Sequence, residues 1–339
     1  MRWLKKILIL LFLLGLLFFV ASKVDVHRLT EQVYHIQALP VIIMVLLFVV
    51  SFLLWNLRWY VSLRVLGRVS FWRLLPVLMA GMFVNNVTPF AGLGGEPLRA
   101  FYAQKLMRKP GTKVFSLTIV EKLFGTVIMA LLLIFSLLFV VINLMEFPVL
   151  RGVALMLLIF FLGAIVIFSL LLGRVSLRKL LFVDVLLIFI YFFRPFSQYL
   201  RAFVSREHFL SSMHQEIDRA KKFLGRWLCN KRFVVINSLL TLVLTVITYL
   251  TVYYGFVAIG LPVSFFTVIV VYTLATIVAD LSFIPGGVGL LEVVNIGLLN
   301  AFGVPLEAAA VVTILNRVVY YFFALGVGYF CLVYLHLKE

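Results

Sequence analysis

The sequence has 339 residues, of which 64% are hydrophobic and 13% are charged. This composition excludes a soluble globular protein, because apolar runs repeatedly reach the roughly 18 to 20 residues that cross a bilayer as a helix and no segment between them is long enough for a second core. The formal net charge of +17 does not indicate a nucleic-acid partner, because the lysines and arginines flank apolar segments, where they direct topology and contact anionic lipid. We expect one all-α polytopic transmembrane domain over residues 1–339.

Six apolar runs are predicted to be full membrane spans. The first follows three basic residues, as in a signal peptide, but its apolar run is long and "VASKVD" is a poor cleavage site, so we expect a retained helix. A seventh run, Leu180–Phe193, has only fourteen residues and is expected to be interfacial or buried. The six predicted spans are Ile7–Ala21, Leu39–Leu57, Val114–Ile142, Val149–Leu172, Phe233–Ile259 and Ala308–Leu335.

Two further apolar stretches, Phe71–Lys105 and Ser264–Phe302, are each split into two half-length pieces by a knot of prolines and glycines. At 1.5 Å per residue each piece is too short to cross the bilayer, so each pair is predicted to be a re-entrant helical hairpin. Non-helical backbone persists at membrane depth only where protein or water satisfies its polar groups. The two knots should therefore lie inside the bundle.

Lysine and arginine positions predict the orientation. Nine Lys or Arg and one acidic residue lie between Arg58 and Lys113, and twelve Lys or Arg and four acidic residues lie between Arg174 and Arg232. Neither Lys nor Arg occurs between Gly260 and Leu315. The positive-inside rule then places both basic clusters, and both termini, on the cytoplasmic side of a multi-pass protein of the cell membrane. The basic, amphipathic segment of about residues 174–232 should lie on the anionic leaflet.

The two interrupted stretches resemble each other. "PFAGLGGE" in the first corresponds to "PGGVGLLE" in the second, and in each the proline precedes the glutamate by seven residues. "TIVEK", Thr118–Lys122, corresponds to "TILNR", Thr313–Arg317, at a shift of 195. We therefore predict an internal repeat, with one copy at about 58–143 and the other at about 253–336. Because the charges place the copies on opposite sides, they are expected to be inverted repeats, an architecture in which discontinuous helices meet at a substrate site near the midplane.

The first knot has the residues of an anion site. Gly94 and Gly95 allow close backbone approach, the following proline suits a first helical turn, and Arg99 adds positive charge near the exposed amides. Glu96 opposes this interpretation, because a carboxylate in the first turn would satisfy the helix dipole itself. Glu96 and its counterpart Glu292 are therefore either protonatable coupling groups, cation partners or helix caps.

The long spans carry a second polar element. Thr118, Glu121, Lys122 and Gly125 share one helical face, and the face is repeated further on as Thr313, Asn316, Arg317 and Tyr320. Ionisable residues inside a membrane usually face a bundle interior or an aqueous cavity. The alternative is that Lys122 and Arg317 snorkel to a membrane edge or form structural ion pairs with the two glutamates.

These patterns give one set of candidate pathway residues and no catalytic residue, cofactor or metal ligand. The five histidines and two cysteines show no metal-ligand spacing. The candidate substrate-binding or pathway residues are Asn85, Asn86, Gly94, Gly95, Glu96, Arg99, Glu121, Lys122, Asp280, Gly286, Gly287, Glu292, Asn316 and Arg317.

With "PFAGLGGEPLRA", "EK", "FIPGGVGLLE" and "NR" in this order, the chain resembles the flippase-like family that includes the transmembrane region of lysylphosphatidylglycerol synthases, the MprF-type proteins. The resemblance covers essentially the whole chain but not the family's soluble aminoacyl-transferase module, so aminoacyl transfer is not carried over. It implies a flippase role, with the matching Glu96, Arg99, Glu121, Lys122, Glu292 and Arg317 in the pathway.

The function expected from residues and resemblance together is transport, not catalysis: an anionic phospholipid or a polyprenyl-phosphate-linked lipid crosses the membrane through a central polar cavity. Membrane lipids are then the partners. Two alternatives stay open. One is an integral membrane enzyme acting on a lipid phosphate, although the acidic and histidine motifs of such enzymes do not occur here. The other is a non-transporting scaffold for a partner lipid synthase.

Overall fold

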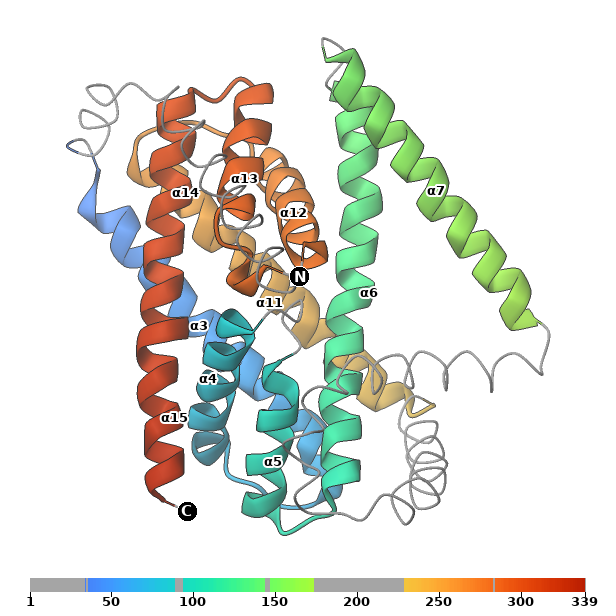
Figure 1. The fold of residues 1–339 in the computed structure, drawn as a ribbon, viewed down its shortest axis with the longest axis vertical. Helices are drawn as coiled ribbons and strands as arrows, with labels where there is room; N and C mark the ends of the chain where they lie inside the picture. The colour runs from blue at the N-terminus through green and yellow to red at the C-terminus, as the bar shows by residue number, and fades with distance from the viewer. Residues whose placement is uncertain are drawn as a thin grey trace, which may run out of the picture.

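A computed structural model of the protein is all-helical over the residues that it describes, which are Tyr34, 36–88, 94–143, 147–173, 229–282 and 284–338, with the backbone alone for 164–173 (Figure 1). The elements are α3 (Ala38–Leu63), η1 (Arg64–Leu66), α4 (Phe71–Val87), α5 (Gly95–Met107), α6 (Gly111–Asn143), α7 (Pro148–Gly173), α11 (Lys231–Ala258), α12 (Phe265–Leu281), η3 (Pro285–Gly287), α13 (Leu290–Ala301), α14 (Leu306–Tyr321), η4 (Phe322–Val327) and α15 (Gly328–Leu337).

Long helices form the frame of the bundle. In Figure 1, α3 and α11 cross it obliquely and pack against each other, while α6 and the continuous rod from α14 to α15 stand upright on either side. Four helical stretches in the described ranges are long and apolar enough to cross a membrane: Ala38–Leu66, Gly111–Asn143, Lys231–Ala258 and Leu306–Leu337. They coincide with four predicted spans, and α7 coincides with a fifth. The predicted first span and Leu180–Phe193 lie outside the described residues, so the count of six stays a prediction.

Short helices form two hairpins, as the interrupted stretches predicted. Helices α4 and α5 have 17 and 13 residues, and α12 and α13 have 17 and 12. The longest of them reaches only about 25 Å at 1.5 Å per residue, less than the roughly 30 Å of a bilayer core. In Figure 1 the first hairpin occupies the lower half of the bundle and the second the upper half, and η3 at the tip of the second contacts α4.

This placement of the hairpins is what inverted repeats require. The internal duplication itself, with its boundaries at about 58–143 and 253–336, stays a prediction. Most of the predicted amphipathic linker, 174–232, lies outside the described residues.

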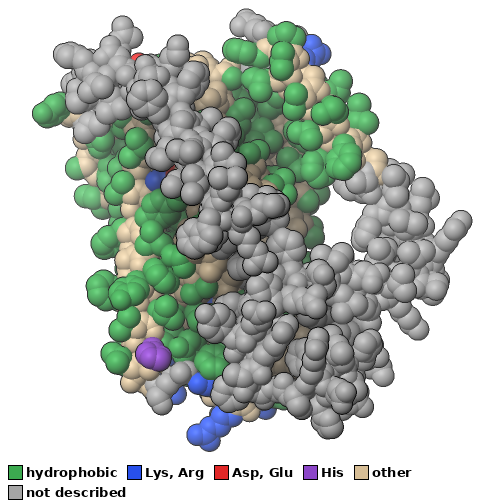
Figure 2. All heavy atoms as spheres, viewed as in Figure 1, with side chains coloured by type: hydrophobic (Ala, Val, Ile, Leu, Met, Phe, Trp, Pro, Cys, Tyr) green, Lys and Arg blue, Asp and Glu red, His purple; other side chains and the backbone are tan. Residues whose placement is uncertain are grey.

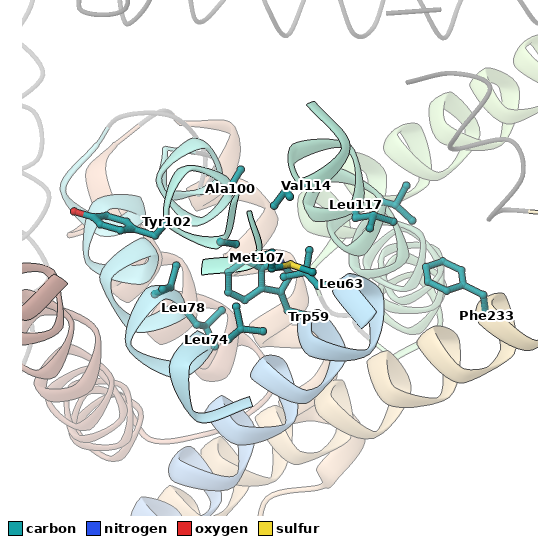
Figure 3. Close-up of a cluster of buried hydrophobic side chains, with 13 residues drawn as sticks. Trp59, Leu63, Leu74, Leu78, Ala100, Tyr102, Met107, Val114, Leu117 and Phe233 are labelled. Carbon is teal, nitrogen blue, oxygen red and sulfur yellow. The ribbon is translucent and has the colours of Figure 1, made fainter. Parts of the chain in front are cut away.

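Apolar side chains hold each hairpin in the frame. Figure 3 shows the cluster around the first hairpin, in which Trp59 of α3 lies among side chains of α4, α5 and α6. A second buried cluster joins α12 and α13 to α11 and α14, with Phe256 and Leu299 fully buried. Within the first hairpin the two backbones almost touch: a Cβ atom on Gly95 would lie 2.0 Å from the carbonyl oxygen of Gly81.

The continuous rod from α14 to α15 packs against both hairpins. Its first part, α14, packs against α13, whereas its last part, α15, packs against α4. There, a Cβ atom on Gly328 would lie 2.7 Å from the carbonyl oxygen of Met79. Between the two parts, Phe322–Val327 form a wide π-helical turn.

The surface is that of a membrane protein. In Figure 2, hydrophobic side chains cover the visible described surface, and lysines and arginines gather at its lower end. That end includes the turn between α5 and α6, where Lys105, Arg108 and Lys109 are exposed. Exposed apolar residues such as Val149 and Phe330 lie away from it along α7 and α15. A multi-pass membrane protein is the architecture that these observations define.

Candidate functional site

The predicted site residues fall into two separate groups. One is a network of buried ion pairs beside the first hairpin, which we call the ion network and which consists of Arg58, Glu96, Arg99 and Glu121. The other is a cavity between the second hairpin, α11, α14 and the end of α4. Sequence spacing had suggested one continuous pathway, and the structure divides it.

Glu121 is the centre of the ion network. Its Oε1 atom accepts hydrogen bonds from Arg58 Nε at 2.9 Å, from Arg58 Nη2, and from Trp55 Nε1 at 3.0 Å, while its Oε2 accepts from Arg99 Nη2 at 2.8 Å. Arg58 also donates to Thr241 Oγ1 on α11 at 3.1 Å. The carboxylate, which is 1% exposed, therefore ties α3, α5, α6 and α11 together.

Arg99 completes the network from α5. Its Nη1 atom donates to Glu96 Oε2 at 2.8 Å, and its guanidinium lies 4.3 Å from the centre of the Trp59 ring. Arg99 is 1% exposed and Glu96 is 0% exposed. Two buried cations thus face two buried carboxylates, and this balance of charge is what makes their burial tolerable.

Lys122 lies at the edge of this group. Its Nζ atom is 3.9 Å from Glu96 Oε1, and its side chain is 35% exposed. It is also close enough to attract Asp280 electrostatically. Lys122 is therefore the charge that lies between the ion network and the second hairpin.

Replacing Arg99 with lysine should destabilise the protein by about 1.5 to 3 kcal/mol. A lysine retains the charge but cannot bridge two carboxylates with a planar fork or stack as well on Trp59. Unfolding by titration with a denaturing detergent in mixed micelles measures the change. The same substitution at the exposed Arg151 is the control and should change the stability by less than about 0.5 kcal/mol; equal effects at both positions would contradict the role given to the fork.

The cavity has a volume of about 300 Å³; most of its surface is apolar, but twelve of the side chains that line it carry polar groups. Seven of the predicted residues line it, and so does the whole predicted stripe on α14. The lining side chains that carry polar groups are Asn85, Asn86, Thr248, Thr251, Tyr272, Thr276, Asp280, Asn295, Thr313, Asn316, Arg317 and Tyr320, together with the backbone of Gly286 and Gly287.

Arg317 lines the cavity and forms an ion pair with Glu292. Its Nε atom lies 2.6 Å from Glu292 Oε1, and its Nη2 donates to the carbonyl oxygen of Gly286 at 3.3 Å. The other oxygen of Glu292 accepts the amide N–H of Gly289 at 2.6 Å, at the start of α13. Glu292 is thus a helix cap and a cation partner at once, which joins two of the three roles left open for it; a role in proton coupling stays a prediction.

The end of α4 meets the tip of the second hairpin at this cavity. Gly286 and Gly287 have φ angles of 60° and 63°, a left-handed conformation that favours glycine. A Cβ atom on Gly286 would lie 3.2 Å from Asn86 Oδ1. Asn86 donates to the Tyr320 hydroxyl at 3.0 Å, and Asn85 accepts the amide N–H of Gly95 at 2.6 Å. The two asparagines therefore connect the first hairpin to the cavity.

Gly94 and Gly95 have a packing role in the structure. A Cβ atom on Gly94 would meet the Thr88 side chain, and one on Gly95 would meet the backbone of Gly81. Both glycines thus bring α5 close to α4. Residues 89–93 of the first knot lie outside the described residues.

Several residues of the ion network and of the cavity are not among the residues predicted from the sequence. The sequence indicates only a topological role for Arg58, as a basic residue at the end of a span, and gives no signal for Trp55 or Thr241. In the cavity, Asn295 and Tyr272 were missed. The spacing could have indicated Asn295, because it follows Glu292 by three residues as Arg99 follows Glu96.

Comparison with known proteins identifies the family. A model described as the lysylphosphatidylglycerol synthase TM region matches residues 4–328. The chain belongs to this family of membrane proteins, which confirms the resemblance seen in its motifs.

Relatives cover nearly the same length. A UPF0104 membrane protein of Pyrococcus horikoshii is 25% identical over 93% of this chain and 92% of its own. A second, from Methanocaldococcus jannaschii, is 25% identical over 96% of this chain and 94% of its own. A third, from Methanothermobacter thermautotrophicus, is 24% identical over 83% of this chain and 79% of its own.

Proposed function

We propose that the protein is a lipid flippase that moves an anionic phospholipid or a polyprenyl-phosphate-linked lipid across the cell membrane. The observation that carries the proposal is the cavity of about 300 Å³, lined by twelve side chains with polar groups, at the place where α4 of the first half-length hairpin meets the tip of the second. Membership of a family named for a lipid synthase's membrane region supports a lipid-related role.

The geometry suits a head group that must cross hydrocarbon. A polar head group loses its water in the bilayer and needs hydrogen-bond partners there. The cavity supplies amides, hydroxyls and the backbone of η3, and Arg317 adds the N–H groups that Glu292 and Gly286 leave available. The acyl or prenyl tails stay outside, against the apolar surface. Hairpins from opposite ends can then expose the cavity to one side at a time.

Arg99 contacts two carboxylates, whereas Arg317 lines the cavity. Arg99 is buried between Glu96 and Glu121, so we assign the contact with a lipid phosphate to Arg317. Exposed Lys105, Arg108 and Lys109 at the α5–α6 turn support a cytoplasmic position of that end, where the C-terminal helix also ends.

Reconstitution tests the proposal. Purified protein in liposomes should move a fluorescent anionic phospholipid between leaflets, measured as the fraction that a membrane-impermeant quencher reaches with time. The double variant Asn316→Leu/Arg317→Gln should lower the rate at least tenfold, because it removes an amide and the positive charge from the cavity.

The matched control is Thr126→Val/Asn143→Leu, which makes similar polar-to-apolar changes at exposed positions of α6. It should keep the rate of the original protein. A cavity variant as fast as the original protein, or an original protein that moves no lipid, would contradict the proposal. Chemical conversion of the lipid by purified protein would replace it with the enzyme alternative, and a co-purifying synthase without lipid movement would replace it with the scaffold alternative.

A further inference from the structure

Asn295 is a buried amide without a hydrogen-bond partner. Its side chain lines the cavity and is 0% exposed, and neither Oδ1 nor Nδ2 is paired with any of the described residues. Buried polar groups in folded proteins are almost always paired, so an exception calls for a specific explanation. An amide that offers one acceptor and two donors to a cavity matches a ligand group that both donates and accepts.

Other polar atoms of the cavity wall around Asn295 are also buried without a hydrogen-bond partner among the described residues. Asn316 Oδ1 and the hydroxyl groups of Thr313 and Tyr272 are buried and lack hydrogen-bond partners within the described ranges. The hydroxyl groups of Tyr272 and Thr313 lie near each other, but not in the geometry of a normal hydrogen bond. Hydroxyl groups are the common ligand groups that satisfy amides and hydroxyls alike, because each donates one hydrogen bond and accepts two.

The first hairpin shows what fills the equivalent place there. Asn295 stands at the position of Arg99, three residues after the glutamate of its knot, and Asn316 stands at the position of Glu121, at a shift of 195. In the first hairpin these positions are charged and pair with each other at 2.8 Å. In the second they are uncharged amides that face a cavity. In the first hairpin the two side chains satisfy each other, whereas in the second the two amides face a cavity that a ligand can enter.

The charges of the cavity are already balanced. Among the described residues that line it, the charged side chains are Asp280 and Arg317. Glu292 neutralises Arg317, and Lys122 attracts Asp280. A second charged group in the head group, beside the phosphate, would have to compete with the pair of Arg317 and Glu292, whereas hydroxyl groups would meet atoms that are unpaired among the described residues.

We propose that the wall around Asn295 selects the lipid by an uncharged, hydroxylated part of its head group, that is, by a polyol or glycosyl unit. This inference rests on the proposed lipid translocation and adds the chemical class of the head group. The phosphate then contacts Arg317, while the hydroxyl groups reach Asn295, Thr313 and Asn316.

Two lipids of equal charge separate the contribution of the phosphate from that of the hydroxyl groups. Phosphatidylinositol and phosphatidylethanol each carry one negative charge on the phosphate, but only the first has a polyol. With matched acyl chains in the same proteoliposomes, phosphatidylinositol should move at least about tenfold faster, because a site built for hydroxyl groups rejects an analogue that lacks them. Native mass spectrometry of the purified protein with an equal mixture of the two lipids measures binding independently of movement.

Asn295→Leu removes the amide and keeps the size of the side chain. The rate ratio and the binding ratio of the two lipids should both fall toward one. Its stability should equal or exceed that of the original protein, because the amide makes no hydrogen bond to the described residues, so a loss of selectivity is not a loss of folding. Asn143→Leu at the exposed end of α6 is the matched control and should keep both ratios.

The outcomes distinguish this inference from the function on which it rests. Equal movement and equal binding of the two lipids would overturn the head-group inference and leave flipping intact. Selective binding without movement would support the inference and overturn the proposed flippase function. Unchanged ratios in Asn295→Leu would overturn the assignment of selectivity to this wall.

Discussion

Glu121→Leu should be strongly destabilising, with a loss of about 3 to 5 kcal/mol in the free energy of unfolding. The substitution removes the carboxylate that both Arg58 and Arg99 contact. Arg99 still has Glu96, but among the described residues the buried Arg58 keeps only Thr241 as a hydrogen-bond partner. A buried charge without its partner costs far more than a lost surface ion pair. Detergent-induced unfolding followed by tryptophan fluorescence measures the loss, since Trp55 lies against the network.

Arg58→Met/Glu121→Leu should recover more than half of that loss. The double variant removes a cation and an anion together and keeps the pair of Arg99 with Glu96. Replacing a buried ion pair with apolar side chains of similar volume is often neutral or stabilising. If the double variant is as unstable as Glu121→Leu, the charge balance is not what the network contributes, and the loss belongs to packing around α6.

Gly95→Ala should also disrupt the fold, by about 3 kcal/mol or more. The added methyl group would lie 2.0 Å from the carbonyl oxygen of Gly81. The methyl group is fixed directly to the backbone, and the carbonyl oxygen is itself part of the backbone. Neither can turn aside as a flexible side chain would, so α5 has to move away from α4. The displacement would strain the Asn85 hydrogen bond to the Gly95 amide and the contacts of Glu96 with Arg99. The thermal unfolding midpoint and the yield of monodisperse protein report the effect.

Gly297→Ala is the matched control in the other hairpin. Nothing lies within 4 Å of the position of a Cβ atom on Gly297, which is in α13. Alanine is also the better helix former by about 1 kcal/mol. This variant should be as stable as the original protein or more so. Equal losses at Gly95 and Gly297 would show that the close approach of α4 and α5 is not what the glycine permits.

The parts of the fold that follow from local spacing could be predicted. Apolar run length indicated the long helices, and the two knots indicated the hairpins, because both signals reside in short segments. The stripe Thr313, Asn316, Arg317 and Tyr320 was placed on one face by the helical period alone, and all four residues line the cavity. Local periodicity was sufficient wherever one helix supplies the whole feature.

The division into two sites could not be predicted, because it depends on contacts between distant segments. Arg58 and Glu121 are 63 residues apart in the chain, and nothing in the pattern around either indicates the other. A lone arginine at the end of a span has the signature of a topology signal. Once Arg58 and Arg99 share Glu121, the arginine beside the first knot is already paired within the described part of the chain. The second hairpin has Asn295 in place of this arginine, and Asn295 lines the cavity.

The wide turn at Phe322–Val327 explains how the rod from α14 to α15 can pack against both hairpins. A π-helical turn contains one residue more than an α-helical turn would, and one residue corresponds to a rotation of about 100° around an α-helix. The turn therefore changes the angular phase of everything that follows it. Before the turn, the rod presents Thr313 and Arg317 to the cavity, and after it the rod presents Gly328 to Met79 on the opposite hairpin. In a regular helix, the small residue that α4 requires would face another direction.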